Sequence, residues 1–462
     1  MSAVMGQPRV VGTRAGSHYW RQAPLPGRTR SYSLLLWTTG LAVFALQFLT
    51  QIEGIQRVVT FGSIGVLLAS ALAKLRARDL RPPAELLFYL GLVLSSLVAL
   101  PWVVDEPLFL RYWRRIAQLF VLMVLVVGIV RRTGRIEAVM TGFLVASAAG
   151  AGYGLLTGEL MESLSPGAMT RASGVFDNPN GLAHVCLLGL FATLFLWECW
   201  RRAVVHVALT VNAALLVAAI VASGSRGAFV GIVGLMVLWA WFCKLREIRR
   251  HPSVLVGLLL VGAFFYQVST LVLAETFLGQ RLRRSESFEE LQEKEARVQL
   301  FESGWHVFKG SPLIGVGLNQ FRAATGRGLI GHADLVELPA TTGIVGTALY
   351  YAFIFGVGRA AKFSMRHLPC GMAEGDRNRL AFAKVAVWLV VGLGFVTMTF
   401  WDIGPMILLS SFLGLAYWHR GTARWRRRSH LAPGGPQWVR TPHLLGPSSS
   451  TRVPPGNDEG AS

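Results

Sequence analysis

Long apolar segments alternate with short polar ones along most of this chain. Runs of roughly 17 to 25 apolar residues are long enough to cross the hydrocarbon core of a bilayer as helices, and about twelve such segments occur. They lie near residues 34–50, 58–73, 84–103, 116–130, 138–156, 181–199, 203–222, 227–243, 253–273, 339–358, 383–400 and 403–418. The pattern therefore predicts an all-α, polytopic integral membrane protein whose transmembrane domain spans residues 31–418.

Residues 274–338 form the only long polar interruption of this apolar body. Within it, Ser287-Phe288-Glu289-Glu290 has the pattern of a helix-capping box. Apolar residues then recur at steps of three to four, which predicts an amphipathic helix over 287–308. They are Phe288, Leu291, Val298, Phe301, Trp305 and Phe308. We expect this helix either to lie along the outer membrane surface and cover a site below it, or only to pack the loop onto the bundle.

The charges change the picture by predicting orientation. A net charge of +20 in a chain that is 53% hydrophobic is not evidence of nucleic acid binding, because the cations concentrate in alternate short loops. By the positive-inside rule, both termini are cytoplasmic and the 274–338 loop faces outward. Arg111, Arg114 and Arg115 depart from the pattern, and mark either a functional outer site or a misplaced boundary.

The two ends of the chain and the cysteines add little chemistry. Residues 1–30 are predicted to be a basic cytoplasmic tail without the features of a cleavable signal peptide. Residues 419–462 begin with a basic run and continue as Pro-, Gly- and Ser-rich sequence, which predicts a disordered cytoplasmic tail. The four cysteines show no metal-binding spacing, so neither a disulfide, a metal nor a cofactor is predicted.

Several short motifs occur in a fixed order between residues 171 and 346. The first are Arg171-Ala172-Ser173-Gly174-Val175-Phe176-Asp177-Asn178-Pro179-Asn180 and Ser223-Gly224-Ser225-Arg226-Gly227. Then come Arg297, Trp305, Pro312, Gly315-Val316-Gly317 and Phe321, followed by the run from His332 through Gly343 to Gly346. In order and spacing, this region resembles the O-antigen ligase and polysaccharide polymerase (Wzy) family of bacterial membrane glycosyltransferases. The family has Asn and Glu where this chain has Ala333 and Thr341, which suggests a different acceptor or a weakened activity.

The resemblance implies a GT-C-like helical membrane protein that needs no metal. It implies transfer of a glycan from an undecaprenyl diphosphate-linked donor to a hydroxyl on a lipid, glycan or protein acceptor. The reaction would take place at the outer face of a bacterial cytoplasmic membrane, and the sequence does not distinguish a ligase from a polymerase.

The residues suit that task independently. Histidine can accept the proton of an attacking hydroxyl near neutral pH, and His332 is the candidate base, with a structural hydrogen-bonding role as the alternative. Guanidinium groups at the outer boundary would bind the pyrophosphate, and Arg226, Arg171 and Arg297 are the candidates. Arg226 alternatively snorkels to lipid phosphates from a simple turn.

Asn180 could orient sugar hydroxyls or merely cap a helix, and Asp334 is predicted to bind substrate with it. Two other functions fit the same architecture: a polysaccharide or lipid transporter or flippase, and a protein that binds lipid-linked glycan without turnover. The span interiors contain almost no acidic residues and no matching pair of broken helices, which argues mildly against a transporter.

Overall fold

The computed structural model describes residues 32–52, 54–164, 170–176, 178–245, 288–326, 333–368 and 374–431, and the side chains of all of these except 288–297, 374 and 423–431. The described residues are helical, without strands. The helices are α1 (Ser33–Gln47), α2 (Gln56–Lys74), α3 (Ala84–Ser96), α4 (Glu106–Thr133), α5 (Glu137–Leu156), α6 (Glu159–Leu164), α7 (Pro179–Cys199), α8 (Ala203–Ala222), α9 (Arg226–Trp239), α13 (Phe288–Gly310), α14 (Phe321–Thr325), α15 (Asp334–Arg366), α16 (Glu374–Leu393) and α17 (Ile403–Leu431). A single-turn 3-10 helix, Leu49–Gln51, follows α1, a two-turn 3-10 helix, Leu97–Trp102, follows α3, and a π-helical turn, Ala240–Lys244, follows α9.

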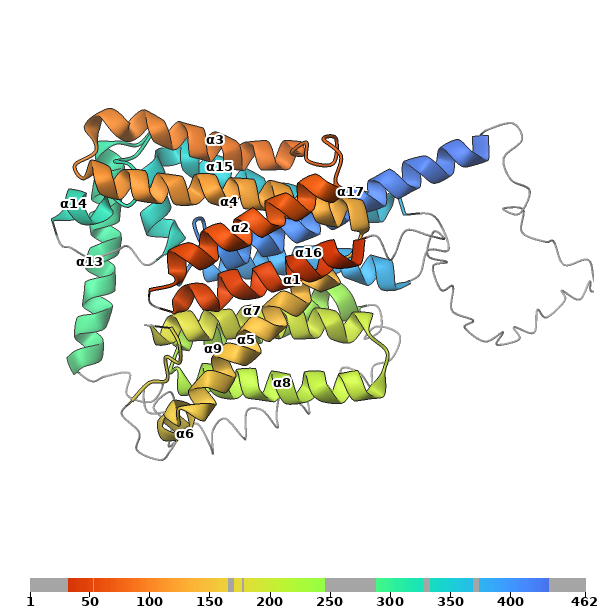
Figure 1. Ribbon diagram of the computed structural model, residues 1–462. Helices are drawn as coiled ribbons and strands as arrows, with labels where there is room; N and C mark the ends of the chain where they lie inside the picture. Colours follow the sequence, from red (N-terminus) through yellow and green to blue (C-terminus); the bar gives the residue numbers. More distant parts are fainter. Residues whose placement is uncertain are drawn as a thin grey trace, which may run out of the picture.

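The long helices run side by side as one bundle, and α13 stands across one end of it (Figure 1). In the described part of the chain, nine helices are long and apolar enough to cross a membrane. They coincide with nine of the predicted spans, while α16 and α17 overlap two more. The predicted span 253–273 lies outside the described residues. The all-α, multi-pass membrane architecture is thus confirmed, whereas the number twelve stays a prediction.

The segment predicted as a span over 383–400 differs from the structure in a way that matters for function. Helix α16 ends at Leu393, and residues 394–402 form a non-helical connector to α17. A Cβ atom at Gly394 would lie 2.8 Å from Oδ2 of Asp334, so this position has no room for a side chain. The connector continues as Phe395, Val396 and Met398, whose apolar character hides the helix end from a hydropathy scan.

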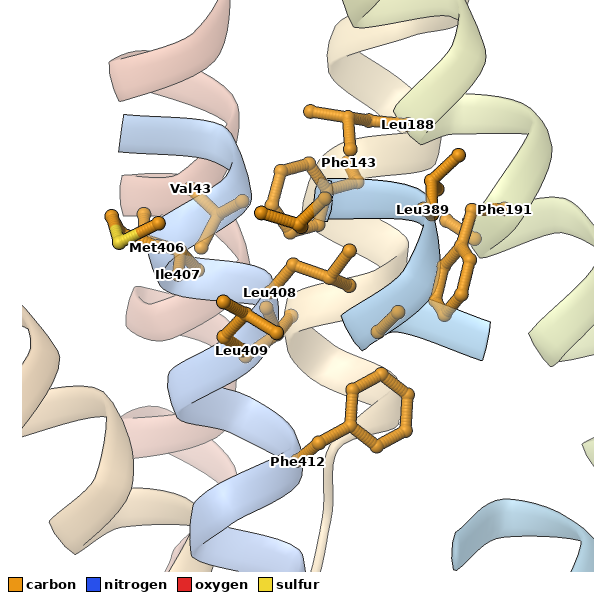
Figure 2. Packing of buried hydrophobic residues seen from close by; sticks show 14 of the residues in the cluster. Val43, Phe143, Leu188, Phe191, Leu389, Met406, Ile407, Leu408, Leu409 and Phe412 are labelled. Carbon is orange, nitrogen blue, oxygen red and sulfur yellow. The ribbon is translucent and has the colours of Figure 1, made fainter. Parts of the chain in front are cut away.

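Helix α17 lies in the middle of the packed core (Figure 2). Its residues Met406 to Leu409 and Phe412 are buried among side chains of α1, α5, α7 and α16. The ring of Phe412 meets those of Phe191 and Phe195 edge to face, with centroids 5.8 Å apart in both pairs. Because lipid is as apolar as these side chains, close packing of this kind, rather than escape from water, holds a membrane bundle together.

Ion pairs join the loops that were predicted to be cytoplasmic. Arg379 lies 2.6 Å from Glu137, and Lys244 lies 2.8 Å from Glu198. These pairs connect the start of α16 to the start of α5, and the end of α9 to the end of α7. The loops predicted to share a membrane side therefore meet at one end of the bundle, and the candidate site residues lie at the other. Which end faces the cytoplasm stays a prediction.

Candidate functional site

The turn between α8 and α9 places Arg226 at the start of a helix. Gly224 has φ of 62°, a left-handed conformation that glycine adopts without strain. Ser225 then caps α9, since its hydroxyl accepts a hydrogen bond from the Ala228 N–H at 3.5 Å. The half-buried Arg226 is the first residue of the helix, where free backbone N–H groups favour anions.

Arg171 is held against this same turn. Its Nε donates to the Ser223 carbonyl oxygen at 2.8 Å, and its Nη2 donates to Oδ1 of Asn180 at 3.1 Å. A backbone hydrogen bond from Ala172 to Ala222 supports the contact. The structure therefore brings together three predicted site residues, Arg171, Asn180 and Arg226, at the adjoining ends of α7, α8 and α9.

Glu159 holds the Arg171 segment in place and was not anticipated from the sequence. Its Oε2 accepts hydrogen bonds from the backbone N–H groups of Ser173, at 3.1 Å, and Gly174, at 2.8 Å. Gly174 has φ of 61°, so the chain reverses here in a conformation that suits glycine. A glutamate at the start of the short helix α6 carries no sequence signal for this role.

The connector 394–402 lies between the arginine cluster and the start of α15. On one side, a Cβ atom at Gly227 would lie 3.2 Å from Val396, so the first turn of α9 packs closely on the connector. On the other side, the Asp334 N–H donates to the Gly394 carbonyl oxygen at 2.8 Å. The connector thus joins α9 to the first turn of α15.

Asp334 is 1% exposed, and its carboxylate accepts hydrogen bonds from the connector and from α15. Oδ1 accepts from the Thr399 N–H at 2.8 Å, while Oδ2 accepts from the Thr399 hydroxyl and, at 3.3 Å, from the Tyr350 hydroxyl. The hydroxyl oxygens of Tyr350 and Thr399 lie 2.5 Å apart. These bonds fix the first turn of α15, directly after the predicted base His332, relative to the connector. Neither Tyr350 nor Thr399 was singled out from the sequence.

The Gly-Val-Gly motif docks into a break in α15. At Gly343 the helix is interrupted by φ 64° and ψ −169°. Across the break, Val316 and Gly317 donate to the carbonyls of Ala340 and Thr341, and Ile344 and Val345 donate to those of Pro312 and Leu313. A Cβ atom at Gly315 would lie 2.4 Å from the Thr341 carbonyl carbon. The glycines of both motifs therefore allow two backbones to touch, which explains their presence without a direct role in chemistry.

Gln320 connects this docked segment to the loop before α4. Its side chain is fully buried. Oε1 accepts from the N–H groups of Val104, at 3.1 Å, and Asp105, at 2.9 Å, while Nε2 donates to the Asp105 carbonyl oxygen at 2.9 Å. One amide thereby satisfies three backbone groups of a loop more than 200 residues away in sequence.

The predicted amphipathic helix exists as α13, but its buried face is not the predicted stripe. Leu300 and Val307 pack against Phe321, Ala340 and Val336. Val298, Phe301 and Trp305, from the predicted stripe, are each more than half exposed. The reason is Gly304, because a Cβ atom there would lie 2.4 Å from Val336. The glycine brings α13 onto α15 and leaves the aromatic stripe facing away.

Some predicted residues cannot be placed. His332 lies outside the described residues, as does the segment from 274 to 287, and Arg297 lies on α13 within the part whose side chains are not described. Within the described residues, no group of three or more His, Cys, Asp or Glu side chains is arranged to hold a metal ion. Metal independence stays a prediction.

A comparison with family models matches residues 211–351 to the model described as O-Antigen ligase. The match begins within α8 and ends within α15, so it includes Arg226, Arg297, His332, Asp334 and the docked Gly-Val-Gly segment. A comparison with curated proteins finds no match. The resemblance inferred from the motifs is thus confirmed over residues 211–351, where the chain matches the O-antigen ligase family.

Proposed function

We propose that this protein transfers a glycan from an undecaprenyl diphosphate-linked donor to an acceptor hydroxyl at the outer face of the cytoplasmic membrane. The observation that carries the proposal is the pair of hydrogen bonds by which Arg171 contacts both Asn180 and the turn that begins α9 at Arg226. The family domain makes ligase- or polymerase-type glycan transfer the expected activity.

Arg226 and Arg171 are proposed to bind the donor pyrophosphate. As the bond between the sugar and the pyrophosphate breaks, the electron pair goes to the leaving oxygen, and negative charge grows there. Donors already fixed in position stabilise such charge without reorganising. Arg171 is oriented by two hydrogen bonds, and Arg226 lies where the helix dipole also favours an anion. Arg297 on α13 is proposed to join them.

His332 is proposed to be the general base. It would take the proton of the acceptor hydroxyl as the oxygen of that hydroxyl forms the new bond to the anomeric carbon. Asp334, two residues later, contributes in this proposal by fixing the start of α15 through Thr399 and Tyr350. Asn180 would orient the donor, since its side-chain amide retains free hydrogen-bonding capacity beside Arg171.

The two remaining candidate functions make different predictions for one experiment. The protein would be reconstituted in lipid nanodiscs with undecaprenyl diphosphate-linked glycans and a mixture of acceptors. Release of free undecaprenyl diphosphate would be measured for wild type, His332→Ala, Arg226→Ala and the control Arg201→Ala, whose exposed arginine lies between α7 and α8, at the opposite end of the bundle from the candidate site.

We expect release by the wild type and by Arg201→Ala. We expect it to fall by about 100-fold or more in His332→Ala and Arg226→Ala, which is a typical contribution of a general base or an oxyanion donor. If wild type and both variants bind the undecaprenyl diphosphate-linked glycan but release no free undecaprenyl diphosphate, the transferase proposal is refuted and a glycan-binding protein is favoured. Carrier movement between leaflets without bond cleavage would favour a flippase.

A further inference from the structure

We propose that Arg111, Arg114 and Arg115 form a second anion site, at the outer end of α4, for the phosphate of a membrane lipid other than the donor. The proposal rests on the proposed function only where it names the reaction's acceptor as one source of that phosphate. These arginines were unexplained by the charge pattern of the loops, and the donor site does not use them.

The three side chains share one face of the helix. At 3.6 residues per turn, positions 111, 114 and 115 fall within an arc of about 100°. All three are exposed, whereas Phe109 and Ile116, on the opposite face, are fully buried. The arginines therefore present their charge together, away from the packed side of α4.

The aromatic residues between the arginines anchor this part of the helix. The ring of Tyr112 lies 4.8 Å from that of Trp401 in the connector, and Nε1 of Trp113 donates to the Val93 carbonyl oxygen at 3.0 Å. The position of the cations is therefore set by packing on two neighbouring segments. A rigid backbone reduces the entropy lost when the guanidinium groups bind a ligand.

The depth of the site suits a lipid headgroup. From Ile116 to Val130 the helix is apolar except for Gln118, a length of about 22 Å at 1.5 Å per residue. Arg111, Arg114 and Arg115 precede this stretch by one to five residues. Further along the same face, Leu122 and Leu125 are buried. The face is thus covered at Leu122 and Leu125 and open at the arginines, at the level where lipid phosphates lie and where Tyr and Trp gather.

Within the described residues, no acidic side chain pairs with these three arginines. Arg114 donates to the carbonyl of Leu110 at 3.3 Å, within its own helix. Burial raises the pKa of Asp402, and the charge of Arg115, which makes no ion pair with that carboxyl group, opposes the shift. Three cations beside one carboxylate leave an excess of positive charge, and guanidinium groups bind phosphate oxygens in pairs.

The connector relates this patch to the donor site. Trp401 and Asp402 lie on the side of α4, while Val396 lies on the side of α9 and Arg226. The helices that carry the two cationic regions therefore both pack against the nine-residue connector 394–402. A lipid phosphate bound at Arg111, Arg114 and Arg115 belongs either to the lipid-anchored acceptor, held beside the donor, or to a bulk phospholipid that seats α4 in the bilayer.

The site is tested by native mass spectrometry of the detergent-purified protein with dioleoyl phosphatidic acid or dioleoylglycerol, which differ by the phosphate. The variant is Arg111→Gln/Arg114→Gln/Arg115→Gln. The matched control, Arg76→Gln/Arg78→Gln/Arg81→Gln, removes three exposed charges between α2 and α3. We expect one retained phosphatidic acid in wild type and control, and an affinity lower by at least about ten-fold in the variant.

Equal retention of phosphatidic acid by the variant and the wild type would overturn the proposal, as would equal retention of dioleoylglycerol by the wild type. Loss of undecaprenyl diphosphate binding in the variant would also overturn it, because the patch would then be part of the donor site. These readouts do not need turnover, so they stand even if the transferase reaction fails.

Transfer in nanodiscs distinguishes the two sources. If the acceptor occupies the site, added phosphatidic acid competes with it and raises the apparent KM for the acceptor in wild type, with less effect in the variant. If a bulk phospholipid occupies it, added phosphatidic acid leaves that KM unchanged or raises the rate. Displacement by millimolar inorganic phosphate alone would indicate a site for a soluble anion and refute the lipid assignment.

Discussion

The backbone contact at Gly343 gives the sharpest prediction of this structure. The substitution Gly343→Ala adds one methyl group where a Cβ atom would lie 2.3 Å from the carbonyl carbon and oxygen of Leu313. It also forces alanine into φ 64° and ψ −169°, a region occupied almost exclusively by glycine. Since the obstructing atoms are backbone, no side chain can rotate away to relieve the clash.

The cost has two parts. Strained backbone of this kind costs about 1–3 kcal/mol. Separation of the two segments would also break hydrogen bonds such as Ile344 to Pro312 at 2.8 Å and Gly317 to Thr341 at 2.9 Å, each with a net contribution of about 0.5–1.5 kcal/mol. We therefore expect Gly343→Ala to destabilise the docked segment by about 2–6 kcal/mol.

The assay combines thermal unfolding with limited trypsin digestion at Lys309 and Arg322, which flank the docked segment. The control is Gly358→Ala in the same helix, where a Cβ atom would meet Val387 at 3.6 Å, an ordinary contact. Alanine there is neutral or stabilising by up to about 1 kcal/mol, as in any helix interior. We expect faster cleavage and a lower melting temperature only for Gly343→Ala. Identical behaviour of the two variants would show that the docked geometry is wrong.

Three further predictions test other contacts. Gln320→Ala leaves three backbone groups of the loop before α4 without their partner, so we expect the free energy of unfolding to fall by about 2–4 kcal/mol. Thermal unfolding measures this loss, and the control Gln51→Ala should not show it. Arg171→Lys cannot reproduce the two hydrogen bonds to Ser223 and Asn180, so the KM for the donor should rise about ten-fold. The control Arg57→Lys, at an exposed arginine, should leave that KM unchanged. Burial raises the pKa of Asp402 above its ordinary value, although the charge of Arg115 opposes the shift. The folded protein thus holds this proton to a higher pH than the unfolded chain, and stability should fall as pH rises from the ordinary carboxylate pKa through the raised one. Asp402→Asn should flatten that part of the pH profile of thermal unfolding, and an unchanged profile would contradict the shift.

Local sequence patterns predicted the elements of this structure better than their contacts. Spans such as Ala203–Ala222 and Pro179–Cys199 appear within two residues of their predicted bounds, because membrane helices must satisfy their backbone hydrogen bonds internally and so show as continuous apolar runs. Arg171 and Arg226 were recognised as candidates from their motifs. Their contact through Ser223 was not, since 52 residues separate the partners of that hydrogen bond.

The parts of the site that sequence reasoning missed are those set by backbone proximity. Gly304 decides which face of α13 is buried, yet hydrophobic periodicity counts glycine on neither face. Gly394 ends α16 against Asp334 inside a run of apolar residues, so the connector was assigned to a span. Thr399 binds Asp334 across 65 residues, and a threonine within an apolar run gives no signal of a buried carboxylate partner.

The connector links the helices that carry the candidate site residues. Its residues have partners on four helices: Gly394 and Thr399 on α15, Val396 on α9, Phe400 on α3 through the Tyr89 hydroxyl at 2.8 Å, and Trp401 on α4. Those helices carry Asp334, Arg226 and the arginine patch on α4. Because buried hydrogen bonds and packed rings define one geometry rather than a continuous range, the two cationic regions should not move independently. Loosening the connector at Thr399 should therefore weaken both anion sites at once, whereas loss of the Arg171 contacts should weaken only the donor site.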